Sequence, residues 1–397
     1  MFCLLCMVTL FSSNAHGQGD NFKLGSMRLN LSATLGFEYD SNLGLAPDNE
    51  VSDIIAKMGI NLGGTWEVTE LNTLRLSIGA RYDKYFHNPQ LDSDRNFLIL
   101  EPGTGISFIM LIGNFTFRIY DDLIFASDPG DNRFIDPQTG QFLTNILAYN
   151  RFENRFGIDG SWEINPYWTA TLGLSRFDVI PISSEFNDLQ RHDYRITLAL
   201  IHAVAANLDV GISNTFTINR WKENFQNNSQ TNSIGGFFVW QPTDNLEVEG
   251  GLFWTSDFFS NNGNNQDTSG NVSAPTGNLT LRHFINPLWQ HAITYGRALP
   301  LGTVSNTVDT QYADYTVQYD GFARSRVDFG VGWINGVDSG GIQPEDFHRW
   351  IFRIGLGYNL SPKLSFRTYY QYALRDSNIP SRNYGQNKVG ITFKYDF

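Results

Sequence analysis

Charged residues recur at alternate positions in several segments of this sequence. Alternate residues of a β-strand point to the same face, so these side chains share one face of an extended chain. A basic set contains Arg75, Arg81, Arg349, Arg353, Arg367, Arg375, Lys388 and Lys394. An acidic set contains Asp209, Glu247, Glu249 and Asp314, with Arg282 among them. On opposite walls of a water-filled lumen, the two sets would create a transverse field that orders water and favours polar solutes.

An alternative leaves these charges without a collective role. Each one would be a solvated residue that pairs with a neighbour and makes no field across the lumen. Even then the space that they face must hold water, because unpaired charges are costly to bury in a dry core. We therefore expect the charged face to line a wet lumen under either interpretation.

The histidines do not favour an enzyme, although histidine is the residue most often used in acid–base catalysis. After the N-terminal segment they are His87, His192, His202, His283, His291 and His348, in different predicted strands, loops and turns. The best candidate, His192 with Asp193, fails because adjacent strand residues point to opposite faces. The Asn-rich stretch 261–267 has one carboxylate, Asp267, which is too few for a calcium site. The sequence therefore predicts no catalytic residue, no metal and no cofactor.

The elements that must position these side chains are strands, and the clearest is the last. In residues 388–397, Val389, Ile391, Phe393, Tyr395 and Phe397 alternate with polar residues and glycine. This period of two is typical of a strand with one apolar and one polar face. The ending is similar to the C-terminal signal of outer-membrane barrels, which implies that the barrel-assembly machinery reads Phe393, Tyr395 and Phe397. The alternative is an ordinary amphipathic edge strand.

The same alternation repeats along the chain and predicts an all-β fold. The predicted strands are 28–40, 53–62, 74–82, 94–109, 114–126, 148–163, 168–179, 190–201, 207–220, 231–241, 246–257, 271–284, 288–298, 310–320, 325–334, 347–360, 364–376 and 384–397. We expect about 18 strands, within a range of 16–18, in a transmembrane antiparallel β-barrel over residues 28–397. Closure then pairs 28–40 with 384–397, so that no free edge faces lipid.

The connections between these strands alternate in length. Short ones such as 110–113 and 164–167 alternate with long polar ones such as 127–147 and 335–346. Membrane barrels of bacteria have short periplasmic turns and long extracellular loops. We therefore expect both termini of the barrel to be periplasmic and the long loops to be extracellular.

Tryptophans identify the face that meets lipid. Trp66, Trp162, Trp168, Trp240 and Trp289 flank short turns, whereas Trp254, Trp333 and Trp350 lie toward the long loops. Such belts mark the two membrane interfaces, with aliphatic residues between them. The apolar stripe should therefore face outward into lipid.

The N-terminus is typical of a secretory signal peptide. Residues 2–11 are apolar, and Ala15 and Gly17 fit a small-residue cleavage site. We expect a signal peptide over 1–17 and a short periplasmic segment over 18–27. Cys3 and Cys6 are the two cysteines and lie in the signal peptide, so disulfides in the mature chain are excluded.

Composition excludes other classes of protein. The 397 residues carry a net charge of −12 and only 17% are charged, which argues against nucleic acid as a partner. After the N-terminus, no run of about 18 apolar residues suits a membrane-spanning helix.

Several short motifs resemble the β-barrel porin 2 family. They are FEYDSN at 37–42, PDNE at 47–50, DD at 121–122, SDP at 127–129 and YGRAL at 295–299. The resemblance covers essentially the whole mature chain. It implies an outer-membrane barrel, often associated with exopolysaccharide production, and no functional residue carries over from the family.

Two functions remain open from the sequence. The first is a porin-like channel for passive diffusion of small polar or charged solutes, because barrels of this size leave an aqueous lumen. The second is an outer-membrane component of exopolysaccharide export or surface assembly, which the family resemblance implies. The expected partners are outer-membrane lipid and lipopolysaccharide, the barrel-assembly machinery and small polar solutes. The sequence does not decide whether the chain forms a homo-oligomer.

The longest loop, 127–147, is a candidate constriction of the lumen. It carries Asp128, Asp131, Arg133 and Asp136 together with more apolar residues than a freely solvated loop needs. Folded inward, its acids would face the basic set of the last strands. The alternative is an external loop that packs over the rim.

Overall fold

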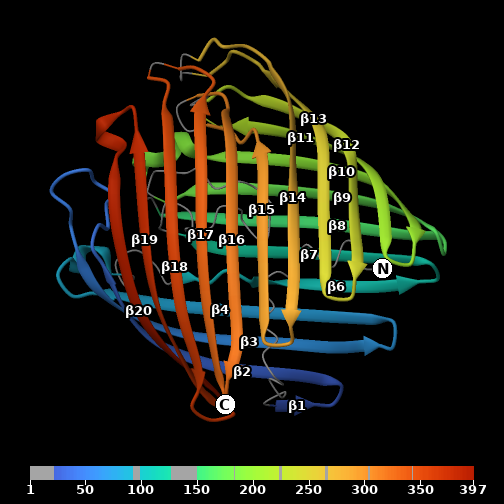
Figure 1. Ribbon diagram of the computed structural model, residues 1–397, viewed down its shortest axis with the longest axis horizontal. Helices are drawn as coiled ribbons and strands as arrows, with labels where there is room; N and C mark the ends of the chain where they lie inside the picture. Colours follow the sequence, from blue (N-terminus) through green and yellow to red (C-terminus); the bar gives the residue numbers. More distant parts are fainter. Residues whose placement is uncertain are drawn as a thin grey trace.

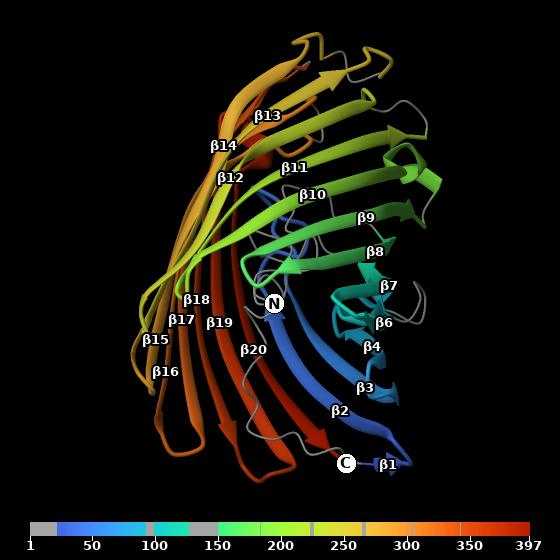
Figure 2. The same cartoon turned by 90° about the vertical axis from the view of Figure 1, so that its right-hand side faces the viewer.

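The computed structural model describes residues 22–92, 99–126, 150–182, 184–222, 226–263, 267–302, 305–341 and 343–397. In these ranges the chain forms one antiparallel sheet of 20 strands, which closes on itself (Figures 1 and 2). Two strands, β1 (Phe22–Leu24) and β5 (Ile99–Leu100), have only three and two residues. The remaining 18 form the wall of an all-β barrel, as predicted. The predicted signal peptide and the loop 127–147 lie outside the described residues.

The 18 long strands follow each other around the barrel in sequence order. They are β2 (Met27–Asp40), β3 (Asp53–Thr69), β4 (Asn72–Tyr85), β6 (Thr104–Ile112), β7 (Phe115–Ala126), β8 (Arg151–Asn165), β9 (Trp168–Pro181), β10 (Arg191–Ala205), β11 (Leu208–Trp221), β12 (Ser229–Thr243), β13 (Leu246–Phe259), β14 (Val272–Asn286), β15 (Trp289–Ala298), β16 (Val308–Phe322), β17 (Ser325–Asp338), β18 (Asp346–Asn359), β19 (Leu364–Ser377) and β20 (Tyr384–Asp396). Single turns of 3₁₀ helix, η1 (Pro89–Leu91) and η3 (Pro380–Arg382), and the longer η2 (Ser184–Leu189) lie between strands. Among the described residues, no helix is long and apolar enough to cross a membrane.

The barrel closes where its last strand pairs with its first long strand. β20 pairs antiparallel with β2 from Ser32↔Asp396 to Asp40↔Lys388, and the two strands lie side by side in Figure 2. On its other edge β20 pairs with β19. The predicted closure of 28–40 with 384–397 is therefore confirmed.

Short turns gather on one rim of the barrel, which we call the short-turn rim. Two residues connect β3 to β4 (70–71) and β12 to β13 (244–245), and four connect β18 to β19 (360–363). The longer connections between described strands lie at the opposite end, which we call the loop rim. Phe397 hydrogen-bonds to the Leu31 carbonyl beside the short-turn rim, and the C-terminus lies there in Figure 1. The predicted alternation of short and long connections is thus present.

Two local features differ from the expected strands. Residues 22–24 form β1 against β2, although 18–27 was expected to lie outside the barrel; three residues are too few to show a period of two. Gly25 makes the connecting turn with a φ of +62°, a conformation that glycine adopts without strain. β3 continues to Thr69, beyond the predicted end at 62, because Gly63 and Gly64 interrupt the apolar alternation without ending the strand.

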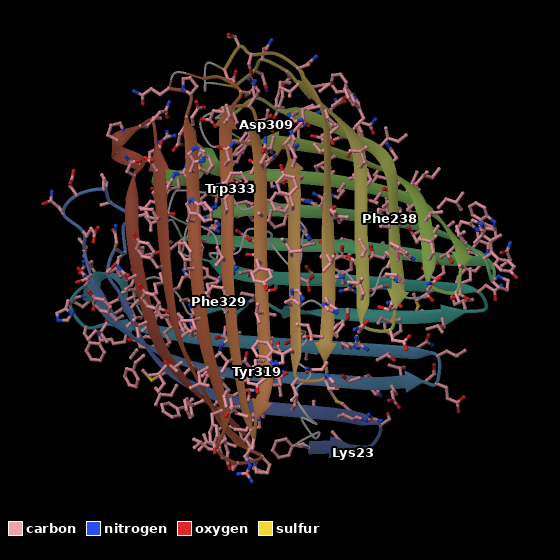
Figure 3. The ribbon with its side chains drawn as sticks, in the orientation of Figure 1. Lys23, Phe238, Asp309, Tyr319, Phe329 and Trp333 are labelled. Carbon is pink, nitrogen blue, oxygen red and sulfur yellow. The ribbon has the colours of Figure 1, made fainter. Side chains whose placement is uncertain are left out.

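The outward face is mostly apolar along the described strands. Phe37 and Ile60 are 43% and 52% exposed, as are many large apolar side chains of their parity. Figure 3 shows Trp333 toward the loop rim, Phe329 at mid-height and Tyr319 toward the short turns. Tyr319 stacks near Trp289 with ring centroids 4.3 Å apart. This arrangement, aromatic ends with an apolar band between, suits a lipid-facing surface.

A small apolar cluster lies on the inward face, in β16 to β20. Its buried members are Val308, Tyr312, Ile334, Phe347, Ile351, Ala373 and Tyr384. Leu45, from the loop after β2, packs against this cluster. The loop between β2 and β3 is therefore anchored on the inward face of the last strands, next to the closure.

Glycine at the closure gives room to a side chain from the neighbouring strand. A Cβ on Gly390 of β20 would lie only 2.3 Å from the ring of Tyr369 in β19. The Tyr369 hydroxyl passes over this glycine and donates a hydrogen bond to Glu38 of β2. Tyr369 therefore links β19 to β2 across β20.

Gly390→Ala should lower the stability of the barrel by about 1–3 kcal/mol, because the added methyl overlaps the Tyr369 ring. The readout is the temperature at which the folded band is lost on an unheated detergent gel. Gly385→Ala on the same strand is the control, since its Cβ would meet only the Tyr372 hydroxyl at 3.9 Å. The same substitution is also made in the Tyr369→Ala variant, which lacks the ring. If Gly390→Ala lowers the stability of that variant as much as it lowers that of the wild type, overlap with the Tyr369 ring is not the cause.

Candidate functional site

All the charged residues that the sequence assigned to the two walls lie on the inward-facing parity. Two cross-strand pairs illustrate this: Arg282 is opposite Glu247, and Arg349 is opposite Arg375. The residues on either side of each pair along the strands have the outward parity. Their role as a pore lining remains a prediction. What the structure adds is how these side chains are partnered.

The basic and acidic sets do not form two separate walls. Arg353 of β18 bonds to Asp314 of β16 at 2.7 Å, so one member of each set forms a pair. The Arg353 side chain crosses the intervening strand, β17, at Gly330. A Cβ on Gly330 would lie 3.3 Å from the Arg353 Nε. The sequence placed these two residues on opposite walls because strand count alone does not show which inward side chains reach across a neighbouring strand.

Most other predicted wall residues also carry a counter-charge. Arg81 bonds to Asp83 at 2.8 Å, Arg367 to Asp328 at 3.0 Å, Lys388 to Asp40 at 3.2 Å and Lys394 to Asp396 at 3.0 Å. Arg375 bonds to Glu345 at 2.7 Å, and Arg282 bonds to both Glu247 and Glu249. Arg349 is 8% exposed and lies between β17 and β19. Within the described ranges, Arg75 and Asp209 make no ion pair.

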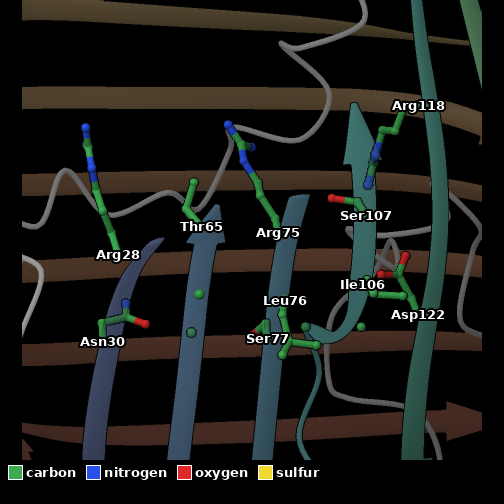
Figure 4. A pocket seen from close by; sticks show the side chains of 14 residues that line it. Arg28, Asn30, Thr65, Arg75, Leu76, Ser77, Ile106, Ser107, Arg118 and Asp122 are labelled. Carbon is green, nitrogen blue, oxygen red and sulfur yellow. The ribbon is translucent and has the colours of Figure 1, made fainter. Parts of the chain in front are cut away.

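Arg75 lies in a cavity of about 280 Å³ on the inward face of β2 to β7. Arg28 of β2 and Arg118 of β7 line the same cavity, and Figure 4 shows their guanidinium groups on either side of Arg75. Polar side chains from the same strands complete the lining: Asn30, Thr65, Ser77, Ser107 and Asp122. We call this the basic cavity, because three guanidinium groups meet one carboxylate there.

Strand register explains why these arginines come together. Arg28 is opposite Thr65, and Thr65 is opposite Arg75, so Arg28 and Arg75 stand on one rung with a small residue between them. Arg118 is opposite Ile109, two residues from Ser107, the partner of Arg75. Gly63 and Gly105 also lie in the lining, where the side chains of Asn30 and Asp122 occupy the positions that their Cβ atoms would take.

Two guanidinium groups of the basic cavity have a carboxylate nearby. Arg28 and Glu67 are 3.3 Å apart, and both side chains are about half exposed. Arg118 is 3.9 Å from Asp159 and lies over the Tyr120 ring at 4.5 Å. Exposed ion pairs of this kind contribute about 0–1 kcal/mol. An incoming anion can bind Arg75, which makes no ion pair within the described ranges.

Sequence reasoning found Arg75 but missed Arg28 and Arg118. Both have the inward parity, so the alternation pattern does predict that they face inward. The pattern does not give the register between strands, and the register decides that the three side chains lie together. Asp122, in the quoted DD motif, is the acidic member of the lining.

A second polar cluster holds the loops together at the loop rim. Glu345 is 2% exposed and bonds to Arg375 at 2.7 Å, Ser377 at 2.7 Å and Arg382 at 2.6 Å. Burial alone would raise the pKa of Glu345, but Arg375, Ser377 and Arg382 outweigh it and the pKa is lowered. Glu345 therefore stays ionised and ties its loop to the end of β19.

Asp267 performs the same role between three loops, one of which is the loop of Glu345. Its carboxylate accepts hydrogen bonds from the backbone N–H of Asn306 at 2.6 Å and of Ser269 at 2.8 Å, and from the Ser339 hydroxyl at 3.0 Å. Burial raises the pKa of Asp267, yet these donors lower it overall. Asp267 was considered for calcium; among the described residues, no group of three or more His, Cys, Asp or Glu could hold a metal.

Two further sequence expectations concern loops and histidines. The candidate constriction residues Asp128, Asp131, Arg133 and Asp136 lie outside the described residues. His192 contacts Asp178, its cross-strand neighbour, at 2.5 Å rather than the adjacent Asp193. Asp193 is on the inward parity beside Arg191, so the pair does not form a catalytic dyad.

Lowering the pH should weaken the loop-rim cluster. A carboxyl with a lowered folded pKa contributes stability above its unfolded pKa of about 4.5, and this is lost as pH falls through the folded pKa. Glu345→Gln should cost on the order of 3 kcal/mol at pH 7, since it leaves Arg375 buried without its counter-charge. It should also flatten the dependence of melting temperature on pH below about 4.5.

The control for this measurement is Asp48→Asn in the exposed loop after β2. It should melt like the wild type at every pH. An unchanged melting temperature of Glu345→Gln at pH 7 would show that the loop-rim cluster does not stabilise the barrel.

Comparison with solved structures places the fold among known barrels. OccK2 (OpdF) of Pseudomonas aeruginosa, in complex with glucuronate, has a TM-score of 0.53 at 10% identity, covering 94% of this chain and 99% of that chain. OpdK of the same organism, with vanillate, has a TM-score of 0.52 at 10% identity, covering 93% and 99%. OccAB3 of Acinetobacter baumannii has a TM-score of 0.52 at 10% identity, covering 94% and 100%.

No family model and no curated protein matches the sequence. The resemblance to the β-barrel porin 2 family, and the link to exopolysaccharide that it implies, therefore remain predictions. At about 10% identity the solved structures show the fold alone. The fold is that of the 18-stranded outer-membrane channels of the OprD/Occ type.

Proposed function

We propose that this protein spans the outer membrane as a channel for passive diffusion of small polar or charged solutes, and that small carboxylates are favoured in it. The basic cavity carries this proposal, because its three arginines and its hydroxyl and amide groups face the lumen. Guanidinium groups match the geometry of a carboxylate and can bind it through two parallel hydrogen bonds. Two of the barrels of similar fold were solved with glucuronate and with vanillate, and both molecules are carboxylates.

The apolar outer wall supports the membrane location. A barrel with many exposed outward Phe, Ile and Leu side chains needs lipid around it, as Phe37 at 43% and Ile60 at 52% illustrate. In this proposal the short-turn rim and both termini are periplasmic, and the loop rim is extracellular. The C-terminal Phe393, Tyr395 and Phe397 are then the residues that the barrel-assembly machinery recognises, and the channel needs no cofactor.

Paired charges along the rest of the inward face suit a channel rather than a binding protein. Arg353 with Asp314, and Arg367 with Asp328, present both signs to water without a large net charge. Such walls remain hydrated and let polar solutes pass without tight binding. The three guanidinium groups of the basic cavity then select among the solutes that enter.

Arg75→Gln combined with Arg118→Gln should reduce the preference for carboxylates. In proteoliposomes, we expect the ratio of glucuronate to glucose influx to fall about tenfold, corresponding to about 1.4 kcal/mol of lost interaction. The same variant should shift the reversal potential in a salt gradient toward cations. The reason is that two positive charges leave the basic cavity while Asp122 stays.

The matched control is Arg353→Gln with Asp314→Asn, which removes an inward pair without changing the net charge. It should leave both the influx ratio and the reversal potential close to those of the wild type. Equal influx ratios in the wild type and in the Arg75, Arg118 variant would refute carboxylate preference. Absence of influx of either solute through the wild type would refute the channel itself.

A further inference from the structure

One rung on the outward face of the barrel is polar, although its surroundings are apolar. Across four neighbouring strands, β8 to β11, its members are cross-strand partners in a continuous row. They are Asn154, Asp178, His192 and Arg220. The row of outward residues two positions further toward the short turns is Phe156, Arg176, Tyr194 and Ile218. Arg176 therefore extends the polar rung by one position.

Arg176 and His192 are held by one carboxylate. The Arg176 Nε lies 2.9 Å from an Asp178 oxygen, and the His192 Nδ1 lies 2.5 Å from the same oxygen. Asp178 is only 12% exposed, whereas the Arg176 side chain is 47% exposed. The Arg176 guanidinium also lies 5.6 Å from the centre of the Tyr194 ring. Asp178 thus fixes the orientation of Arg176 and leaves its remaining donors directed at the surroundings.

Arg220 and Lys222 add positive charge without adding a counter-charge. Arg220 is opposite His192 in the rung, and Lys222 follows directly after β11, with its backbone N–H bonded to the Gln190 carbonyl. Both are exposed, and neither makes an ion pair within the described part of the chain. Three permanent cations therefore stand around Asp178, and a second outward carboxylate, Asp121, lies 2.5 Å from the Asn154 amide at the edge of the rung.

The height of this cluster on the wall indicates its environment. Arg220 is the next-to-last residue of β11 at the loop rim, and Asp178 is three residues from the end of β9. Directly below, toward mid-height, Leu174, Ile196 and Leu198 are 40%, 44% and 52% exposed. Charged residues on the lipid face cost about 0–1 kcal/mol near the interface, but about 2–4 at the midplane. The cluster therefore lies where lipid headgroups meet acyl chains.

We propose that Arg176, Arg220 and Lys222 bind the phosphate group of a membrane lipid whose acyl chains lie along Leu174 and Ile196. Arginine forms bidentate hydrogen bonds to phosphate, and the excess of one cation over Asp178 and Asp121 suits a group that carries negative charge. The apolar trough beneath favours a lipid over a free anion. A second copy of the chain is disfavoured, because a two-fold contact would set this basic cluster against itself.

The test is lipid binding by the full chain in detergent, measured by native mass spectrometry. The probes are bisphosphorylated lipid A, the same lipid after removal of its phosphates, and inorganic phosphate. We expect the wild type to retain bisphosphorylated lipid A at least tenfold more tightly than the dephosphorylated form. Arg176→Gln with Arg220→Gln should abolish this difference, and Lys222→Gln alone should reduce it severalfold.

Arg297→Gln is the matched control. Arg297 is also an outward arginine close to the loop rim, but it bonds bidentately to Asp309 at 2.8 and 2.6 Å and offers no excess charge. Its substitution should leave lipid binding unchanged. Equal retention of both lipid forms by the wild type, or an undiminished difference in the Arg176, Arg220 variant, would overturn the proposal. Binding of inorganic phosphate at the same concentration as lipid A would also overturn it, since the site would then recognise a free anion.

Discussion

The fold depends on one constraint: a sheet placed in lipid must leave no backbone N–H or C=O without a partner. Closure of β20 on β2 meets this constraint, and the seam is reinforced by inward polar contacts. Lys57 bonds to Glu38 at 2.8 Å, and Lys388 bonds to Asp40 at 3.2 Å. Once the sheet is closed, strand parity sends apolar side chains to lipid and charges to the lumen. The basic cavity, the inward pairs and the outward polar rung all follow from that division.

Inward glycines allow long side chains to cross neighbouring strands. Arg353 passes over Gly330 to reach Asp314, and Tyr369 passes over Gly390 to reach Glu38. The result is a lumen whose charges are paired locally and hydrated, rather than divided into two opposite walls. Within this background, Arg28, Arg75 and Arg118 form a local cluster of guanidinium groups. In the proposed channel, this cluster is the feature that would discriminate between polar solutes.

The sequence predicts the strands, the alternation of turns and loops, and the closing pair, because a period of two with aromatic ends is a strong local signal. It also predicts the inward face of residues such as Arg75 and Arg353. It does not predict that Arg353 reaches Asp314, or that Arg28 and Arg118 join Arg75, because these contacts depend on register over several strands. Nor does parity alone reveal the rung with Asp178 and Arg220, since the outward stripe was expected to be apolar.

The central claim is that the lumen is an open, hydrated path lined by the inward face. Single-channel conductance of the purified protein in a planar lipid bilayer tests this claim most directly. We expect discrete, reproducible current steps that scale linearly with voltage and grow with salt concentration, with a reversal potential that favours anions. A correctly folded, heat-modifiable barrel that inserts but passes no current would contradict it.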